Sequence, residues 1–188
     1  MLAAISADVQ RALRRNNAFG LIGVLRVLRS NHGLQALATY RFGRWLSRLD
    51  RHRIGVLVTA PLHPIYRFAA FLTRKTYGIE LDPDADIGPG LFIGHFGGIS
   101  VKSCRIGPHC AIQQQVTLGP AQTGGAGPVL GEGVWVGAHA RICADVSIGD
   151  GATIGAGAVV AHDIPARCLV LGNPGRIAQR DYDNQSFL

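Results

Sequence analysis

A histidine in a glycine-rich stretch is the clearest candidate for chemistry in this sequence. His95 follows Gly94 and is closely followed by the pair Gly97 and Gly98. A hydroxyl group is a poor nucleophile until its proton is removed, and an imidazole, with an ordinary pKa of about 6.5, accepts that proton near neutral pH. Glycines beside it let a second reactant approach the backbone closely. The alternative is that His95 is an ordinary residue of a surface turn.

The element that must position this histidine is a repeat. An aliphatic residue recurs every six positions from Ile87 to Leu118, with one extra residue between Ile99 and Ile106, and again in the same phase from Leu130 to Val160 after an interruption of two periods. A period of six fits neither an α-helix nor a simple alternating strand, but it is typical of a solenoid of short strands and turns. We therefore predict a parallel β-helix whose aliphatic residues point inward. The twelve positions are Ile87, Ile93, Ile99, Ile106, Ile112, Leu118, Leu130, Val136, Ile142, Ile148, Ile154 and Val160.

The charge distribution places a domain boundary near Gly78. Residues 1–78 hold thirteen Lys and Arg against Asp8 and Asp50, a net charge of +11, whereas residues 79–188 hold six against ten acidic residues, a net charge of −4. Apolar residues at helical spacing predict a helical domain over residues 1–78, followed by the β-helix over residues 79–188. The segment 119–128, rich in glycine and proline, is expected to leave the β-helix as a loop.

The basic domain has two interpretations. The stretch 54–72 is nearly apolar, but it contains Pro61, His63, Pro64 and Arg67, which favours a buried or interfacial helix over a membrane span. With so many basic residues nearby, the domain either contacts an anionic membrane surface or presents a solvated face while it packs on a trimer. Nucleic-acid binding is not expected, because the basic residues lack interleaved aromatic platforms.

Cysteine spacing indicates a reducing compartment. The four cysteines, Cys104, Cys110, Cys143 and Cys168, form neither C-x-x-C pairs nor the dense framework of a secreted domain. No secretory signal stands out at the N-terminus, because Arg26 interrupts the apolar run 18–28. We predict a cytoplasmic protein, with peripheral contact to the inner membrane face as an option.

The repeat resembles the hexapeptide-repeat acyltransferases over residues 78–180, and the stretch 78–99 is similar to the serine acetyltransferase branch. This resemblance implies a left-handed parallel β-helix that forms a homotrimer, or a dimer of trimers, and uses acetyl-CoA as cosubstrate. It implies that His95 is the catalytic base and that Glu80, fifteen positions earlier, orients it. Gly94, Gly97 and Gly98 are then expected to meet the acceptor. The alternative reading makes Glu80 a solvated charge.

The C-terminal coils resemble the segments with which this superfamily binds coenzyme A. The similar stretches are 154–165 and 172–177. The alternative is that residues 173–175 merely turn the chain off the last coil. By this resemblance Arg176 meets a phosphate, for which a guanidinium is well suited. The residues expected to bind the cosubstrate are Gly137, Ala138, Ala156, Ala161, His162 and Arg176.

Two departures from the serine acetyltransferases bear on the acceptor. The Asp that precedes the catalytic histidine in that branch is Gly94 here, and its Arg-His pair in the extended loop is replaced by Ala126 and Gly127. Losing groups that would hold an amino acid favours a neutral acceptor, a sugar or glycan precursor in exopolysaccharide or capsule synthesis. The segments 31–33 and 40–45 are also similar to such acetyltransferases. Serine O-acetylation is the alternative.

Two other classes remain open. Some related β-helix trimers are carbonic anhydrases that gather histidines around zinc, and the candidates here are His95, His109 and His139. None of these belongs to a short ligand pair, so we predict that no metal is required. The other class is a non-catalytic trimeric scaffold. For the enzyme we expect direct transfer without an acyl-enzyme, because no cysteine lies beside a histidine in sequence.

Overall fold

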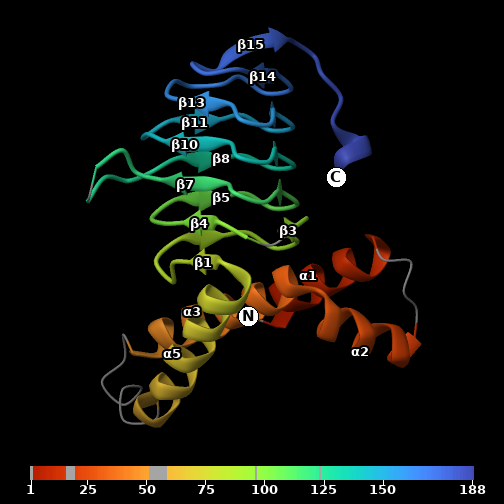
Figure 1. Ribbon diagram of the computed structural model, residues 1–188, viewed down its shortest axis with the longest axis vertical. Coiled ribbons are helices and arrows are strands. Elements are labelled where there is room, and N and C mark those ends of the chain that lie inside the picture. Colours follow the sequence, from red (N-terminus) through yellow and green to blue (C-terminus); the bar gives the residue numbers. More distant parts are fainter. Residues whose placement is uncertain (1, 16–19, 51–58, 96, 123) are drawn as a thin grey trace.

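The computed structural model describes residues 2–15, 20–50, 59–95, 97–122 and 124–188. It consists of a helical region and a column of short parallel strands that rises from it (Figure 1). Residues 54–58 of the apolar stretch and Thr123 of the loop lie outside the described parts. The helical elements are α1 (Leu2–Arg15), α2 (Gly20–Ser30), α3 (His32–Asp50), η1 (Ala60–Leu62), α5 (His63–Leu72) and η2, one turn of π-helix (Thr73–Tyr77).

The strands form the three faces of the column. Face A contains β1 (Ile79–Leu81), β4 (Ile99–Val101), β7 (Thr117–Gly119), β10 (Arg141–Cys143) and β13 (Val159–Val160). Face B contains β2 (Asp86–Ile87), β5 (Arg105–Ile106), β8 (Val129–Leu130) and β11 (Ser147–Ile148). Face C contains β3 (Phe92–Ile93), β6 (Ala111–Ile112), β9 (Trp135–Val136), β12 (Thr153–Ile154), β14 (Leu169–Leu171) and the antiparallel β15 (Arg176–Gln179). A short helix, η3 (Gln185–Phe187), follows.

The aliphatic positions of the repeat form ladders inside the column. All twelve are buried, with at most 4% of any of them exposed. On face C, for example, Ile93 pairs with Ile112, which pairs with Val136 in the next coil. Each coil contributes only a few apolar side chains, so the core is continuous only because the coils stack. The predicted parallel β-helix is confirmed.

The ladder on face A departs from the expected period at its first step. Leu118 pairs with Val101, not with Ile99. Val101 on face A follows Ile93 on face C by eight residues. In the next coil, Leu118 on face A follows Ile112 on face C by only six. The turn between β3 and β4 is therefore two residues longer than the turn above it. His95 lies in this longer turn.

A buried ion pair joins the helical region to the first coil. Arg41, which is 7% exposed, donates from Nε to Asp8 Oδ2 at 3.0 Å and from Nη2 to the carbonyl of Gly88 at 2.6 Å. The other carboxylate oxygen of Asp8 accepts the backbone N–H of Gly90 at 2.7 Å. Burial raises the pKa of Asp8, although Arg41 opposes that rise. These contacts fix α1 and α3 beneath the β-helix.

The helical region ends abruptly. η2 ends at Tyr77, Gly78 adopts the left-handed conformation with φ 62°, and β1 begins at Ile79. Glycine reaches this conformation without a Cβ clash. In the described ranges of the chain, no helix combines the length and the hydropathy needed to cross a membrane.

Candidate active site

The turns from face C to face A stack along one corner of the column. Backbone N–H groups bind the coil above: Gly94 to Ile112 O at 2.9 Å, and Gly137 to Ile154 O at 2.7 Å. This corner carries His95 in its lowest turn and Ala156 three coils higher. Because stacked strands lie about 4.8 Å apart, those two turns are separated by roughly 14 Å along the axis.

His95 lines a cavity of about 250 Å³ between the β-helix and the helical region. His95 is exposed to solvent. One wall comes from the end of β3, and the other from the junction of α2 and α3. The residues lining the cavity are Ser30, Asn31, His32, Gly33, Ile93, Gly94 and His95. We call it the His32–His95 cavity. Its helical wall was not predicted from the sequence.

The start of α3 is held firmly against β3. Asn31 caps the helix, because its Oδ1 accepts the N–H of Leu34 at 2.9 Å. The ring of His32 stacks on that of Tyr77, with 4.3 Å between centroids and 19° between planes. A Cβ on Gly33 would lie 2.6 Å from the Cβ of Ile93, so only glycine permits this approach.

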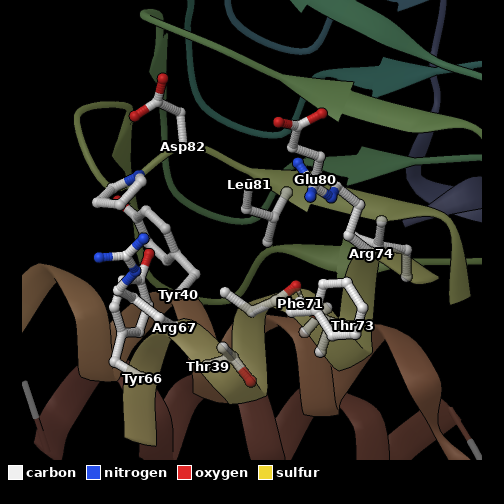
Figure 2. Close-up of a pocket in the computed structure, with 14 residues that line it drawn as sticks. Thr39, Tyr40, Tyr66, Arg67, Phe71, Thr73, Arg74, Glu80, Leu81 and Asp82 are labelled. Carbon is white, nitrogen blue, oxygen red and sulfur yellow. Dashed lines mark hydrogen bonds between the residues drawn. The ribbon is translucent and has the colours of Figure 1, made fainter. Parts of the chain in front are cut away.

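Glu80 lies on the strand below the His95 turn. Glu80 pairs with Ser100 of β4, and the carbonyl of Gly78 just before β1 accepts the N–H of Ile99 at 2.9 Å. The exposed carboxylate lines a separate cavity of about 440 Å³ between α3, α5 and β1. Figure 2 draws it on the same side as the guanidinium of Arg74. No hydrogen bond joins Glu80 to His95 in this conformation, so the orienting role of Glu80 stays a prediction.

Glycines keep the His95 turn narrow. Gly98 has a φ of 64°, and a Cβ on it would lie 2.2 Å from the side chain of Gln115 in the next coil. A Cβ on Gly94 would lie 2.3 Å from the side chain of Gln113. Gly97, in contrast, faces open space. The two glutamines therefore cover the turn from above, and they are a part of the candidate site that sequence reasoning missed.

The predicted loop leaves the neighbouring corner, from face A to face B. It connects β7 to β8, and Asp145 of the next coil accepts the N–H of Gly127 at 2.7 Å. Gly127 has a φ of 71°, and a Cβ on it would lie 1.8 Å from the carbonyl oxygen of Ser103. The backbone here leaves no room for a side chain, so a histidine does not fit at this position.

Among the residues predicted to bind the cosubstrate, two share a cavity. His162 and Arg176 line an open space of about 490 Å³ together with Pro174, Gly175 and Ile177. The other four lie on the two corners that flank face A: Gly137, Ala138 and Ala156 share the corner of His95, and Ala161 lies on the corner of the loop. The structure therefore does not gather all six at one point.

The cysteines lie apart from this corner or inside the core, whereas His139 lies on the corner, two coils above His95. Burial raises the pKa of Cys104 to about 12 and that of Cys110 to about 11, so both are thiols at neutral pH. His109 lies on the corner between faces B and C, away from His95 and His139. In the parts of the chain that the structure describes, no three His, Cys, Asp or Glu residues are grouped as metal ligands.

Comparison with known proteins identifies relatives along nearly the whole chain. Residues 127–162 match the family described as bacterial transferase hexapeptide (six repeats). A serine acetyltransferase of Synechococcus elongatus is 36% identical over 183 residues, covering 96% of this chain and 70% of that protein.

Solved structures with the same fold carry ligands. Soybean serine acetyltransferase complexed with serine superposes with a TM-score of 0.77 at 30% identity, covering 93% of this chain and 68% of that one. A serine acetyltransferase in complex with CoA gives a TM-score of 0.74 at 27% identity, with coverages of 93% and 68%. The predicted left-handed parallel β-helix with an N-terminal helical domain is thereby confirmed.

Proposed function

Because this chain belongs to the serine acetyltransferase family and is an acetyl-CoA-dependent acyltransferase, we propose that its acceptor is L-serine and its general base His95. The observation that carries this proposal is the match of 96% of the chain to a serine acetyltransferase. It favours serine over the glycan acceptor that the loop composition predicts. The experiment that tests it is turnover of L-serine by the native protein and by a His95 variant.

The mechanism is direct transfer. His95 removes the proton of the serine hydroxyl, the oxygen attacks the thioester carbon, and the C–S bond of acetyl-CoA breaks as the ester C–O bond forms. The proton passes from His95 to the departing thiolate. The exposed position of His95 near the open backbone of Gly97 supports access of both reactants to the base. Backbone N–H groups of this turn are the proposed donors to the developing oxyanion.

Glu80 is proposed to orient His95. Support comes from its place on β1, the strand below the His95 turn, where Glu80 pairs with Ser100 of β4. A carboxylate bonded to the second ring nitrogen fixes the tautomer and stabilises the imidazolium.

Acetyl-CoA is proposed to lie along the column. An elongated cosubstrate parallel to the axis suits the roughly 14 Å between the His95 turn and the turn of Ala156. A Cβ on Gly137 would lie 2.6 Å from the backbone nitrogen of Ala156, so only glycine fits there. No side chain therefore covers the backbone of this corner at position 137. Backbone groups of Gly137, Ala138, Ala156 and Ala161 would then meet the pantetheine arm, while His162 and Arg176 line the cavity proposed for the phosphates.

A neutral sugar hydroxyl is the second candidate acceptor. The specific observation that favours it is the charge of the site: among the residues that the structure describes, no Lys, Arg, Asp or Glu lines the His32–His95 cavity, and Ala126 and Gly127 supply no cation from the loop. A panel of hexoses and sugar nucleotides, compared with L-serine at equal concentration, separates the two candidates.

The assembly and location are proposed in the same way. A homotrimer, which light scattering would detect as three times the mass of one chain, is supported by the β-helix fold. The four free cysteines support a cytoplasmic compartment.

Contact of α5 with an anionic lipid surface is supported by its exposed Ile65 and Phe68 beside Arg67.

A further inference from the structure

We propose that the His32–His95 cavity binds the acceptor and that His32 donates a hydrogen bond to the acceptor's carboxylate. This inference rests on the proposed function, because it takes L-serine as the acceptor. It assigns a positioning role to a residue of the helical region, with the reacting hydroxyl directed to His95. Both histidines line one cavity, although they come from different parts of the chain.

The size of the cavity selects a small acceptor. Its volume of about 250 Å³ is below the range of roughly 300–1,000 Å³ that is usual for pockets that take drug-sized ligands. An amino acid of a few heavy atoms fits such a space, whereas a sugar nucleotide would extend far outside it. The presence of His95 in the wall places a bound hydroxyl within reach of the general base.

The polarity of the cavity suits an anion. The polar residues among its described lining are Ser30, Asn31, His32 and His95, and no Asp or Glu lies among them to repel an anion. A carboxylate moved out of water needs hydrogen-bond donors, and an imidazole offers at least one N–H in either protonation state.

The loop positions 126 and 127 offer no side-chain donor to the acceptor carboxylate. Ala126 has no donor in its side chain, and the backbone at Gly127 has no room for one. A serine carboxylate therefore lacks a side-chain partner from these two loop positions. In the helical wall, Ser30 donates to the carbonyl of Arg26 and Asn31 caps α3, so we assign the contact with the carboxylate to His32.

His32 is held ready for binding. Its ring stacks on Tyr77, and its backbone lies between the helix cap at Asn31 and the close contact of Gly33 with Ile93. A side chain whose position is fixed before the ligand arrives loses little conformational entropy on binding. Stacking and hydrogen bonding are separate properties of this ring, so substitutions can separate them.

Two substitutions at His32 test the proposal. His32→Phe keeps an aromatic ring to stack on Tyr77 but removes both ring nitrogens, whereas His32→Gln keeps a donor and removes the aromatic ring. Initial rates are measured with acetyl-CoA and either L-serine or serinol, in which a hydroxymethyl group replaces the carboxylate. Thermal unfolding of each variant verifies that it is folded.

We expect His32→Phe to raise the KM for L-serine about 10- to 100-fold, the loss of one hydrogen bond to a charged group. The KM for acetyl-CoA and the turnover of serinol stay unchanged, and His32→Gln remains within about threefold of the native protein. Equal losses with serine and serinol, or a His32→Gln variant as impaired as His32→Phe, would assign His32 a structural role and overturn the proposal.

The test also separates this proposal from the proposed function. If the native protein acetylates serine and His32→Phe does so equally well, the site assignment is wrong and the function stands. If the native protein acetylates a hexose but not serine, the acceptor assignment is wrong, and the carboxylate site is overturned with it.

Discussion

His32 and His95 line the same cavity, although one begins a helix of the N-terminal region and the other lies in a turn of the β-helix. The helical region therefore builds one wall of the candidate site. The buried pair of Arg41 and Asp8 holds that region beneath the first coil, and thus fixes the geometry of the wall. The helical region is part of the catalytic unit in this account.

Replacing Glu80 tests whether a carboxylate orients His95. We expect Glu80→Gln to lower kcat about 10- to 100-fold, with both KM values unchanged, because the general base loses the group that fixes its tautomer. Asp84→Asn, an exposed carboxylate of the same coil, is the control and should behave as the native protein. An unchanged kcat in Glu80→Gln would mean that Glu80 serves only the cavity that it shares with Arg74.

Replacing Arg176 tests the proposed phosphate site. Arg176→Gln should raise the KM for acetyl-CoA about tenfold and leave the KM for the acceptor unchanged, because a charge-assisted bond to a phosphate is lost. With S-acetylpantetheine, which lacks the nucleotide, the variant and the native protein should be equal. Arg180→Gln is a matched exposed control outside the cavity. Equal KM values for acetyl-CoA in both variants would contradict the assignment.

Thiol titration tests the direct mechanism. Three cysteines are buried, and burial raises the pKa of Cys104 and Cys110, so their thiolate fraction is very small at pH 8. We expect only the partly exposed Cys143 to react quickly with a thiol reagent, and all four cysteines to react after denaturation. Fast reaction of three or four thiols in the native protein would reopen the question of a cysteine nucleophile.

Vesicle binding tests the proposed lipid contact of α5. Phe68 is 64% exposed beside Arg67, so binding to phosphatidylglycerol vesicles should exceed binding to phosphatidylcholine vesicles and should weaken with salt. Phe68→Glu should abolish sedimentation with anionic vesicles, and Val129→Glu, at another exposed apolar position, should not. If the native protein stays in the supernatant with anionic vesicles, this contact does not exist.

The β-helix could be predicted from sequence because each coil repeats the same inward position. Ile106 and Ile112 occupy equivalent places on two faces, so their spacing reports the coil directly. The extra residue between Ile99 and Ile106 indicates a register slip, but the sequence does not show which residue of β4 continues the ladder. Both Ile99 and Val101 are buried, and only the strand pairing reveals that Val101 continues the ladder.

The helical wall of the site could not be predicted in the same way. The contact between Gly33 and Ile93 joins residues far apart in sequence and leaves no periodic signal. In the sequence, Gln113 and Gln115 are only two polar residues between the ladder positions Ile112 and Leu118. Their role depends on the coil spacing, which brings their side chains over Gly94 and Gly98. Packing across elements, not local pattern, decides such positions.

The most direct test is thiol release from acetyl-CoA with L-serine as acceptor, for the native protein, His95→Asn and His109→Asn. His109 is an exposed histidine on another corner, so it is the matched control. We predict serine-dependent release in the native protein and in His109→Asn, and a loss of at least about a hundredfold in His95→Asn. Serine turnover that survives in His95→Asn would contradict His95 as the general base, and no release with serine from the native protein would contradict the acceptor.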